Sequence, residues 1–159
     1  MIERTLVLIK PDGVQRGLSG RILQRFEDAG LKIVGMKMKQ VDADFSKQHY
    51  SAHLEKPFYP GLEIMITEGP VIAMILEGLH AVELVRKMVG GTEPRTAPPG
   101  TIRGDFAHHS YAATDAAGKS IKNLVHASGN VEEAKEEVSL WFSSEELHDY
   151  KTVHEVHVF

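Results

Sequence analysis

Two short, continuous apolar runs constrain the fold of this 159-residue chain more than any other feature: TLVLI at 5–9 and VIAMIL at 71–76. A strand with one face in solvent alternates apolar and polar residues, so unbroken runs of this length are typical of buried central strands. Each run is far shorter than the roughly 20 apolar residues that span a bilayer. We therefore expect a sheet with a buried centre, no membrane partner and no signal peptide.

The order of the other elements narrows the fold class. Lys10-Pro11-Asp12-Gly13 is a turn signal after the first run, and the Gly- and Pro-rich stretch from Gly90 to Lys119 predicts a long loop. Strands are predicted at 4–9, 31–41, 70–76 and 122–125, and helices at 18–30, at 43–53, after Pro57, at 80–88 and from Asn130. This order favours an α+β fold in one domain, residues 1–159, with helices packed on an antiparallel sheet in the split βαβ arrangement.

Net charge and cysteine content exclude several function classes. The formal net charge of −4 gives no basic footprint, so we expect no specific nucleic-acid partner. The chain has no cysteine, which excludes disulfides, thiol catalysis and thiolate metal sites. The absence of cysteine fits a cytoplasmic protein.

His126 differs in its setting from the other eight histidines. It ends an apolar run and stands just before the helix start at Asn130, where backbone N–H groups favour anions. Two interpretations are open: a core histidine with satisfied hydrogen bonds, or a nucleophile or general base that faces a phosphate. His49 and His53 have metal-ligand spacing, but a zinc-hydrolase motif needs Glu where Tyr50 stands, so a solvated helix face is the favoured interpretation.

A phosphate site in this chain would have to use side chains. Neither G-x-x-x-x-G-K-[ST] nor G-x-G-x-x-G is present, which leaves no backbone cradle of those kinds. Polar residues beside predicted turns are the candidates: Lys10, Arg86, Thr92 and Arg103. Each alone is an ordinary surface residue, and only their convergence in space would make a site.

Four segments, taken in order, resemble the motifs of the nucleoside diphosphate kinase family. They are TLVLIKPDGVQRG, HYSAHLEKPFYPGL, PPGTIRGDF and NLVHASGNVEEAKEEVSLWF, and the similarity runs from residue 3 to residue 150. The resemblance implies a ferredoxin-like α/β sandwich with a four-stranded antiparallel sheet and helices on its faces. It also implies transfer of a γ-phosphoryl group from a nucleoside triphosphate to a diphosphate, by a ping-pong mechanism through a phosphohistidine at His126.

The same resemblance assigns roles to the remaining site residues. Ser128 and Glu137 match the pair that holds the imidazole, and Tyr50 matches an aromatic hydroxyl beside the transferring group. The nucleotide ligands implied are Lys10 and Asn123 on the sugar, Arg86, Thr92 and Arg103 on the phosphates, and Phe58 and Leu62 on the base. Apolar contacts to the base imply broad base specificity. Mg²⁺ is expected to be held mainly by the phosphates, with no protein ligand.

The family also implies a homo-oligomer, a hexamer or a tetramer. The alternatives are a catalytically weak nucleotide-binding or regulatory module of the same fold, and an RNA-recognition domain, whose aromatic strand signature this chain lacks. Two departures from the family pattern stand out: Gly129 replaces the usual Asp, and the segment 107–119 adds about ten residues. We expect that segment to be a surface excursion with two possible outcomes: it is merely exposed, or it packs on a neighbouring subunit or over the base with Tyr111 as its anchor. Subunit contact is the favoured outcome.

Overall fold

The computed structural model describes residues 1–158 and contains one antiparallel sheet of four strands, in the order β2-β3-β1-β4. The strands are β1 (Ile2–Ile9), β2 (Lys32–Lys39), β3 (Val71–Leu79) and β4 (Val125–Ala127). β1 and β3, which carry the two apolar runs, occupy the centre and pair with each other along their whole length. The predicted ferredoxin-like fold is confirmed.

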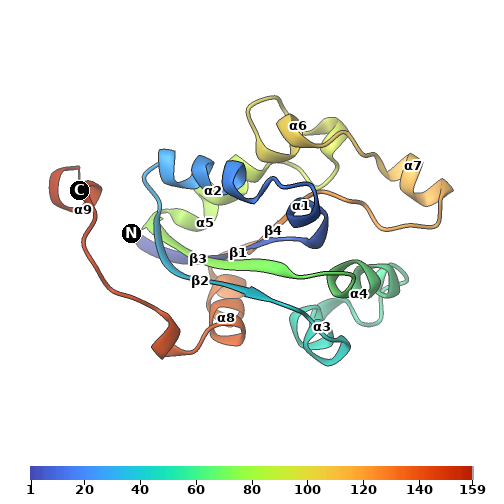
Figure 1. The fold of residues 1–159 in the computed structure, drawn as a ribbon, viewed down its shortest axis with the longest axis horizontal. Helices are drawn as coiled ribbons and strands as arrows, with labels where there is room; N and C mark the ends of the chain where they lie inside the picture. Colours follow the sequence, from blue (N-terminus) through green and yellow to red (C-terminus); the bar gives the residue numbers. More distant parts are fainter. Residues whose placement is uncertain (159) are drawn as a thin grey trace.

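Helices cover both faces of the sheet (Figure 1). One face carries α2 (Ser19–Asp28) and α5 (Ala81–Val89), and the other carries α8 (Val131–Trp141) with α3 (Ala43–His49) and α4 (Tyr59–Thr67) at its end. Along β1, Val7 and Ile9 enter the first core, while Leu6 and Leu8 enter the second. Burial on both faces is the reason that this strand has no polar alternation.

The pattern of β2 is the reverse of what the sequence predicts. Methionine and lysine alternate from Met36 to Lys39, the pattern of a half-buried strand, but the apolar side chains are the outward ones: Met36 and Met38 are 53% and 61% exposed. A bulge between Ile33 and Gly35 shifts the pairing with β3 by one residue, which exchanges the two faces of the strand beyond it. The ammonium groups of Lys37 and Lys39 lie over aromatic rings instead.

Three connections differ from the prediction, each because of local backbone chemistry. Pro11 opens a short helix, α1 (Pro11–Gln15), where a turn was predicted. Tyr50 separates α3 from a single helical turn, η1 (Ser51–His53), so the predicted helix 43–53 is broken. Leu124 has φ of 73°, a left-handed backbone that cannot belong to an extended strand. The strand predicted at 122–125 is therefore interrupted, and β4 begins at Val125.

The predicted loop 90–119 contains three short helical segments. They are η2 (Pro94–Thr96), α6 (Ile102–Phe106) and α7 (Tyr111–Ala116). Thr101 and Ser110 cap α6 and α7 by accepting hydrogen bonds from backbone N–H groups of the first turn. Neither helix has a long apolar stripe, although Ile102 of α6 is fully buried in the first core, and this is why periodicity did not predict them.

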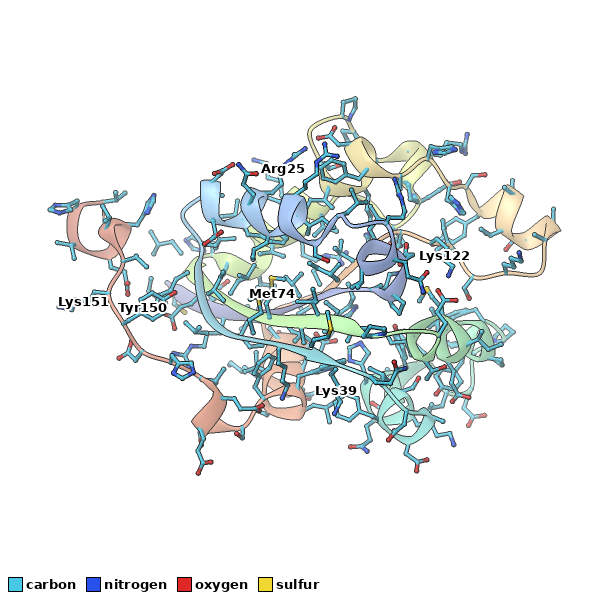
Figure 2. All side chains as sticks on the ribbon, viewed as in Figure 1. Arg25, Lys39, Met74, Lys122, Tyr150 and Lys151 are labelled. Carbon is cyan, nitrogen blue, oxygen red and sulfur yellow. The ribbon has the colours of Figure 1, made fainter. Side chains whose placement is uncertain are left out.

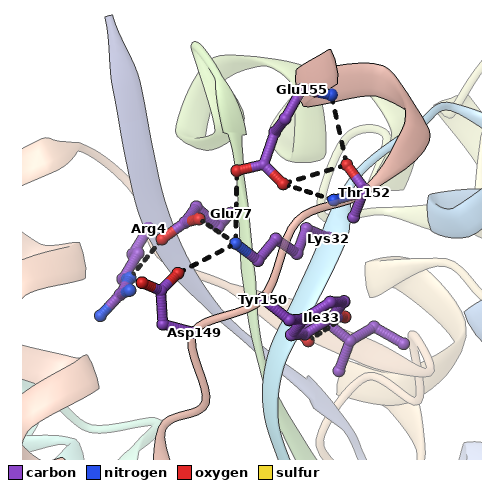
Figure 3. Close-up of polar contacts among 8 residues, drawn as sticks. All are labelled: Arg4, Lys32, Ile33, Glu77, Asp149, Tyr150, Thr152 and Glu155. Atoms are coloured by element: carbon purple, nitrogen blue, oxygen red, sulfur yellow. Dashed lines mark hydrogen bonds and ion pairs between the residues drawn. The ribbon is translucent and has the colours of Figure 1, made fainter. Parts of the chain in front are cut away.

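The C-terminal segment, with η3 (Ser144–Glu146) and α9 (Val153–His157), packs along the start of β2. Lys32, only 4% exposed, forms ion pairs with Glu77, Asp149 and Glu155 (Figure 3). Tyr150 donates its hydroxyl hydrogen to the Ile33 carbonyl at 2.6 Å. Within residues 1–158, every helix falls short of the length and apolarity needed to cross a bilayer.

Candidate active site

A cleft of about 1000 Å³ lies at one end of the sheet, where β1 and β4 meet α3, α4, α5, α6 and α8. Ten of the eleven site residues expected from the sequence line it: Lys10, Tyr50, Phe58, Leu62, Arg86, Thr92, Arg103, Asn123, His126 and Glu137. The eleventh, Ser128, is fully buried behind Glu137. The polar residues that are unremarkable one by one therefore converge in one place.

His126 is joined to Glu137 and Ser128 by hydrogen bonds. Its Nε2 lies 2.9 Å from Glu137 Oε1, and Ser128 Oγ donates to Glu137 Oε2 at 2.5 Å. The Ser128 hydroxyl also accepts from the backbone N–H of Leu6 at 3.2 Å, which fixes its orientation. Glu137 thus spans from α8 to the end of β4, and the alternative of an ordinary exposed helix glutamate is excluded.

The charge of Glu137 decides the tautomer of His126. Burial raises the pKa of Glu137, but the hydrogen bonds from His126 and Ser128 outweigh it, and the net pKa lies below the usual glutamate value. An ionised carboxylate can only accept hydrogen bonds, so His126 Nε2 carries the hydrogen. In the neutral imidazole the lone pair is then on Nδ1, the nitrogen with no hydrogen-bond partner among residues 1–158.

His49 is a site residue that the sequence did not predict. A solvated helix face was favoured for it, but its side chain is 1% exposed, while His53 on η1 is exposed. Trp141 Nε1 donates to His49 Nδ1 at 3.1 Å, and the ring packs edge-on against His126 at a centroid distance of 4.7 Å. Burial lowers the pKa of His49 to about 3, so this imidazole stays neutral beside His126.

His49, His126 and Glu137 form the one group among the described residues whose spacing could hold a metal ion. Two imidazoles and one carboxylate suit a transition metal better than Mg²⁺, which prefers oxygen ligands. Moreover, the Trp141 indole N–H already occupies the His49 lone pair. The residues therefore do not form a Mg²⁺ cage.

Buried cations form the opposite wall of the cleft. Lys10 is 5% exposed and donates to Asn123 Oδ1, and burial lowers its pKa to about 8. Arg103 is also 5% exposed; burial and the nearby charge of Arg86 lower its pKa to about 10. No carboxylate pairs with Lys10, Arg86 or Arg103 within residues 1–158. This charge without a counterion makes the wall a site for an anion.

Arg103 is held by three backbone carbonyls. Its guanidinium donates to Asn123 at 3.2 Å, to Gly90 at 3.0 Å and to Val125 at 2.7 Å. Asn123 in turn donates from Nδ2 to the Thr92 carbonyl at 2.9 Å. The arginine therefore ties the loop after α5 to the residues that lead into β4, and its orientation is fixed before any ligand enters.

An apolar rim borders the cleft at the start of α4. Phe58 is 52% exposed, and Leu62, one helical turn later, packs partly against the core. Tyr50 is buried between this rim and His49, and burial raises the pKa of its hydroxyl. Phe58, Arg103 and His126 thus line one and the same cleft.

The two departures from the family pattern both lie beside this cleft. Gly129 donates its N–H to Glu133 Oε2 at 3.0 Å, and a Cβ at this position would meet that carboxylate oxygen at 2.6 Å. The added segment also contributes residues that the sequence did not assign to the cleft: Tyr111, Thr114, Asp115, Gly118 and Lys119. In the sequence, the extra length of this segment was the one indication that its residues take part in the site.

Comparison with known proteins agrees with this geometry. The family model for nucleoside diphosphate kinase matches residues 3–147. The chain is 54% identical over 148 residues to the nucleoside diphosphate kinase of Pyrococcus horikoshii, covering 93% of this chain and 90% of that protein. It is 50% identical over 146 residues to that of Thermus thermophilus, covering 92% and 99%.

Two solved structures share the fold at similar identity. One is a transition-state mimic of the Borrelia burgdorferi nucleoside diphosphate kinase with bound vanadate and ADP. It has a TM-score of 0.93 at 42% identity, covering 97% of this chain and 95% of that one. The Halobacterium salinarum enzyme in complex with CDP has a TM-score of 0.88 at 41% identity, covering 100% and 99%. The chain belongs to the nucleoside diphosphate kinase family.

Proposed function

We propose that His126 carries the phosphoryl group in the family's reaction, the transfer of a γ-phosphoryl group from a nucleoside triphosphate to a nucleoside diphosphate. Nδ1 attacks the γ-phosphorus, the bond to the bridging oxygen breaks, and the diphosphate leaves. A terminal oxygen of a second diphosphate then attacks the same phosphorus and frees the imidazole. The hydrogen bond between His126 Nε2 and Glu137 carries this assignment, because it leaves Nδ1 as the free nucleophile.

Glu137 and Ser128 act on the imidazole rather than on the nucleotide. When Nδ1 gains phosphorus the ring becomes positively charged, and the carboxylate 2.9 Å from Nε2 stabilises that charge. Ser128, held by Leu6 and by its own bond to Glu137, keeps the carboxylate in place. A pre-arranged ring needs no reorganisation as the reaction proceeds.

The cleft gives a nucleotide one orientation. Stacking on Phe58 and Leu62 places the base at the exposed rim, and Lys10 and Asn123 lie where a sugar hydroxyl would follow. The phosphates then meet Arg86, Thr92 and Arg103, with Tyr50 beside the transferring group. Phosphoryl transfer needs positioning and charge stabilisation above all, which this wall of cations supplies.

Mg²⁺ fits this site as an ion bound chiefly by the phosphates. Two of the carboxylates that line the cleft are engaged, Glu137 by His126 and Ser128, and Glu133 by Gly129 and Asn130. When bound, the ion would offset charge on the phosphate oxygens. The chain's own contribution is to hold those oxygens with arginine and threonine.

Labelled ATP tests the proposed function. We expect label from γ-labelled ATP to remain on the protein after gel filtration, to survive alkali, and to be lost in mild acid, as a phosphohistidine is. Added GDP should remove it within one turnover. Alkali-labile, acid-stable label, the behaviour of phosphoserine, would reject His126 as the carrier.

Nucleotide affinity should fall at alkaline pH because of Lys10. Its pKa of about 8 means that the free protein loses this charge as pH rises through 8, so bound phosphates attract it less. We expect the Kd for ADP to increase between pH 7 and pH 9.5, at most about tenfold per pH unit. Lys10→Arg should remove this dependence, because a guanidinium stays charged. Calorimetry at several pH values measures it, and a flat Kd for the wild-type protein would contradict it.

Assembly into a homo-oligomer is supported by the outer edge of β2. Within residues 1–158 no other strand pairs with this edge; the C-terminal segment bonds to it at Ile33 and Val34, and Met36 and Met38 stand exposed beyond these residues. An exposed apolar edge strand is a template for pairing with another chain. We propose that a second copy covers it, which light scattering on the purified protein would test. Hexamer and tetramer remain open, as does the predicted subunit contact at Tyr111.

We also propose that residues 1–159 form one domain, because the C-terminal segment is anchored on the sheet by Lys32. A cytoplasmic location remains a prediction from the sequence. Nothing in the described residues favours the alternative of a catalytically weak regulatory module, since His126 and the cations face one cleft.

A further inference from the structure

The added segment, residues 107–119, together with Ser120, forms an ordered arm beside the cleft. Its helix α7 starts at the cap residue Ser110 and ends in a turn where Lys119 N–H bonds to the Thr114 carbonyl at 2.9 Å. At the start of the arm, the Arg95 N–H donates to the His109 carbonyl at 3.0 Å, and the Tyr111 N–H to Glu93 Oε1 at 3.1 Å. This hydrogen-bonded arm is a fixed wall rather than a loose excursion.

The far end of the arm meets α4. The Ser120 hydroxyl lies so close to Gly61 that a Cβ there would overlap it, and Lys122, labelled in Figure 2, pairs with Glu68 just after α4. Gly61 stands between Phe58 and Leu62 in the sequence. The end of the arm therefore faces the rim where the base is proposed to stack. Figure 1 shows α7 and α4 at the same end of the sheet.

The arm presents unpaired polar groups to the cleft. Asp115 and Lys119 both line it, and neither side chain has a hydrogen bond or ion pair among residues 1–158. The two are four residues apart, yet they do not pair with each other. A free carboxylate and a free ammonium on the same wall offer one acceptor group and one donor group to a ligand.

We propose that Asp115 and Lys119 read the hydrogen-bonding edge of a guanine base in this cleft. Guanine carries two N–H donor groups beside a carbonyl oxygen. A carboxylate can accept from both donors in a bidentate pair while an ammonium donates to the carbonyl. Adenine, cytosine and uracil each offer a carboxylate only one donor group on that edge. The inference deepens the proposed function, since it rests on the base lying at Phe58.

The expected preference is modest, because both side chains are exposed and water competes with the base. We therefore expect GDP to be favoured over ADP by roughly three- to tenfold. Broad base specificity is retained at that level.

Phosphoenzyme made with labelled ATP isolates the acceptor step. We would mix it with GDP, ADP or CDP and measure the concentration dependence of label loss. Wild-type protein should react with GDP at the lowest half-saturating concentration. Asp115→Asn and Lys119→Met should each bring the GDP and ADP values to within about twofold, because each removes a hydrogen bond that guanine makes and adenine does not: the second donor to the carboxylate, or the carbonyl to the ammonium. Asp28→Asn, an exposed change on α2, is the matched control and should keep the preference.

Phe58→Ala supplies the contrast, since lost stacking should weaken all three diphosphates together. Equal wild-type values for GDP and ADP would overturn the proposal, as would a preference that both arm variants retain. If no phosphoenzyme forms, the proposed function fails, but calorimetric titration with GDP and ADP still tests whether Asp115 and Lys119 recognise guanine. Tighter GDP binding that Asp115→Asn abolishes would support it there, and equal binding would reject it.

Discussion

His126→Asn is expected to take up no label from ATP and to lose turnover by roughly 10⁴-fold or more, the scale for removing a catalytic nucleophile. The amide keeps a polar group of similar size beside Glu137, but it has no ring nitrogen that can accept phosphorus. The side chain is 25% exposed and stands on a short strand paired with β1, so the fold should tolerate the change.

A control separates lost chemistry from lost folding. His148→Asn changes an exposed histidine whose backbone, not its side chain, bonds to Val34. Both variants should melt within a few degrees of the wild-type protein, and the control should keep full turnover. Turnover within tenfold of wild type in His126→Asn would contradict the assignment of the nucleophile.

Arg103→Ala is expected to reduce both turnover and stability. Loss of one preorganised donor to the transferring phosphoryl group costs roughly 10²–10³ in turnover. In addition, the carbonyls of Gly90, Asn123 and Val125 each lose a hydrogen bond; Asn123 keeps the one from the Val125 N–H, while a buried carbonyl left unpaired, as at Val125, costs about 1–3 kcal/mol. Steady-state kinetics and denaturant unfolding measure the two losses. A turnover loss below about threefold would mean that Arg103 serves only the fold.

Arg86→Ala separates the two roles. Arg86 is exposed on α5 and has no hydrogen bond to the backbone of the loop, so its removal should lower turnover on the same scale without lowering the free energy of unfolding. Arg103→Lys should restore charge but not the three directed donors, so that rescue is poor in both measurements. A stable, fully active Arg103→Lys variant would contradict the proposed role of the forked guanidinium donors of Arg103.

Regular elements with a single strong pattern could be predicted from the sequence. The apolar runs predicted β1 and β3, because strands buried on both faces have no polar positions. Asn130 with Glu133 predicted the start of α8, and the structure shows the cap: Asn130 Oδ1 accepts from the Glu133 N–H at 2.9 Å. These features depend on residues close in sequence, which a pattern records.

Elements shaped by bulges, caps and strained backbone could not be predicted from the sequence. One bulged residue in β2 turned Met36 and Met38 outward, and nothing in the alternation marks it. The left-handed Leu124 is fixed by Asp12, whose carboxylate accepts its N–H at 3.0 Å across 112 residues of sequence. Local residue preferences did not predict the bulge in β2 or the left-handed Leu124, because tertiary contacts override such preferences.

By itself, the sequence determined the order of elements, the buried centre of the sheet and the candidates that line the cleft. Only the tertiary structure decided how those candidates touch. His49 became a neutral neighbour of His126 because burial lowers its pKa, and Trp141, 92 residues away, donates to its Nδ1. The residue types could be read in order along the chain, but the protonation state of each depends on burial and partners, which arise when distant segments pack together.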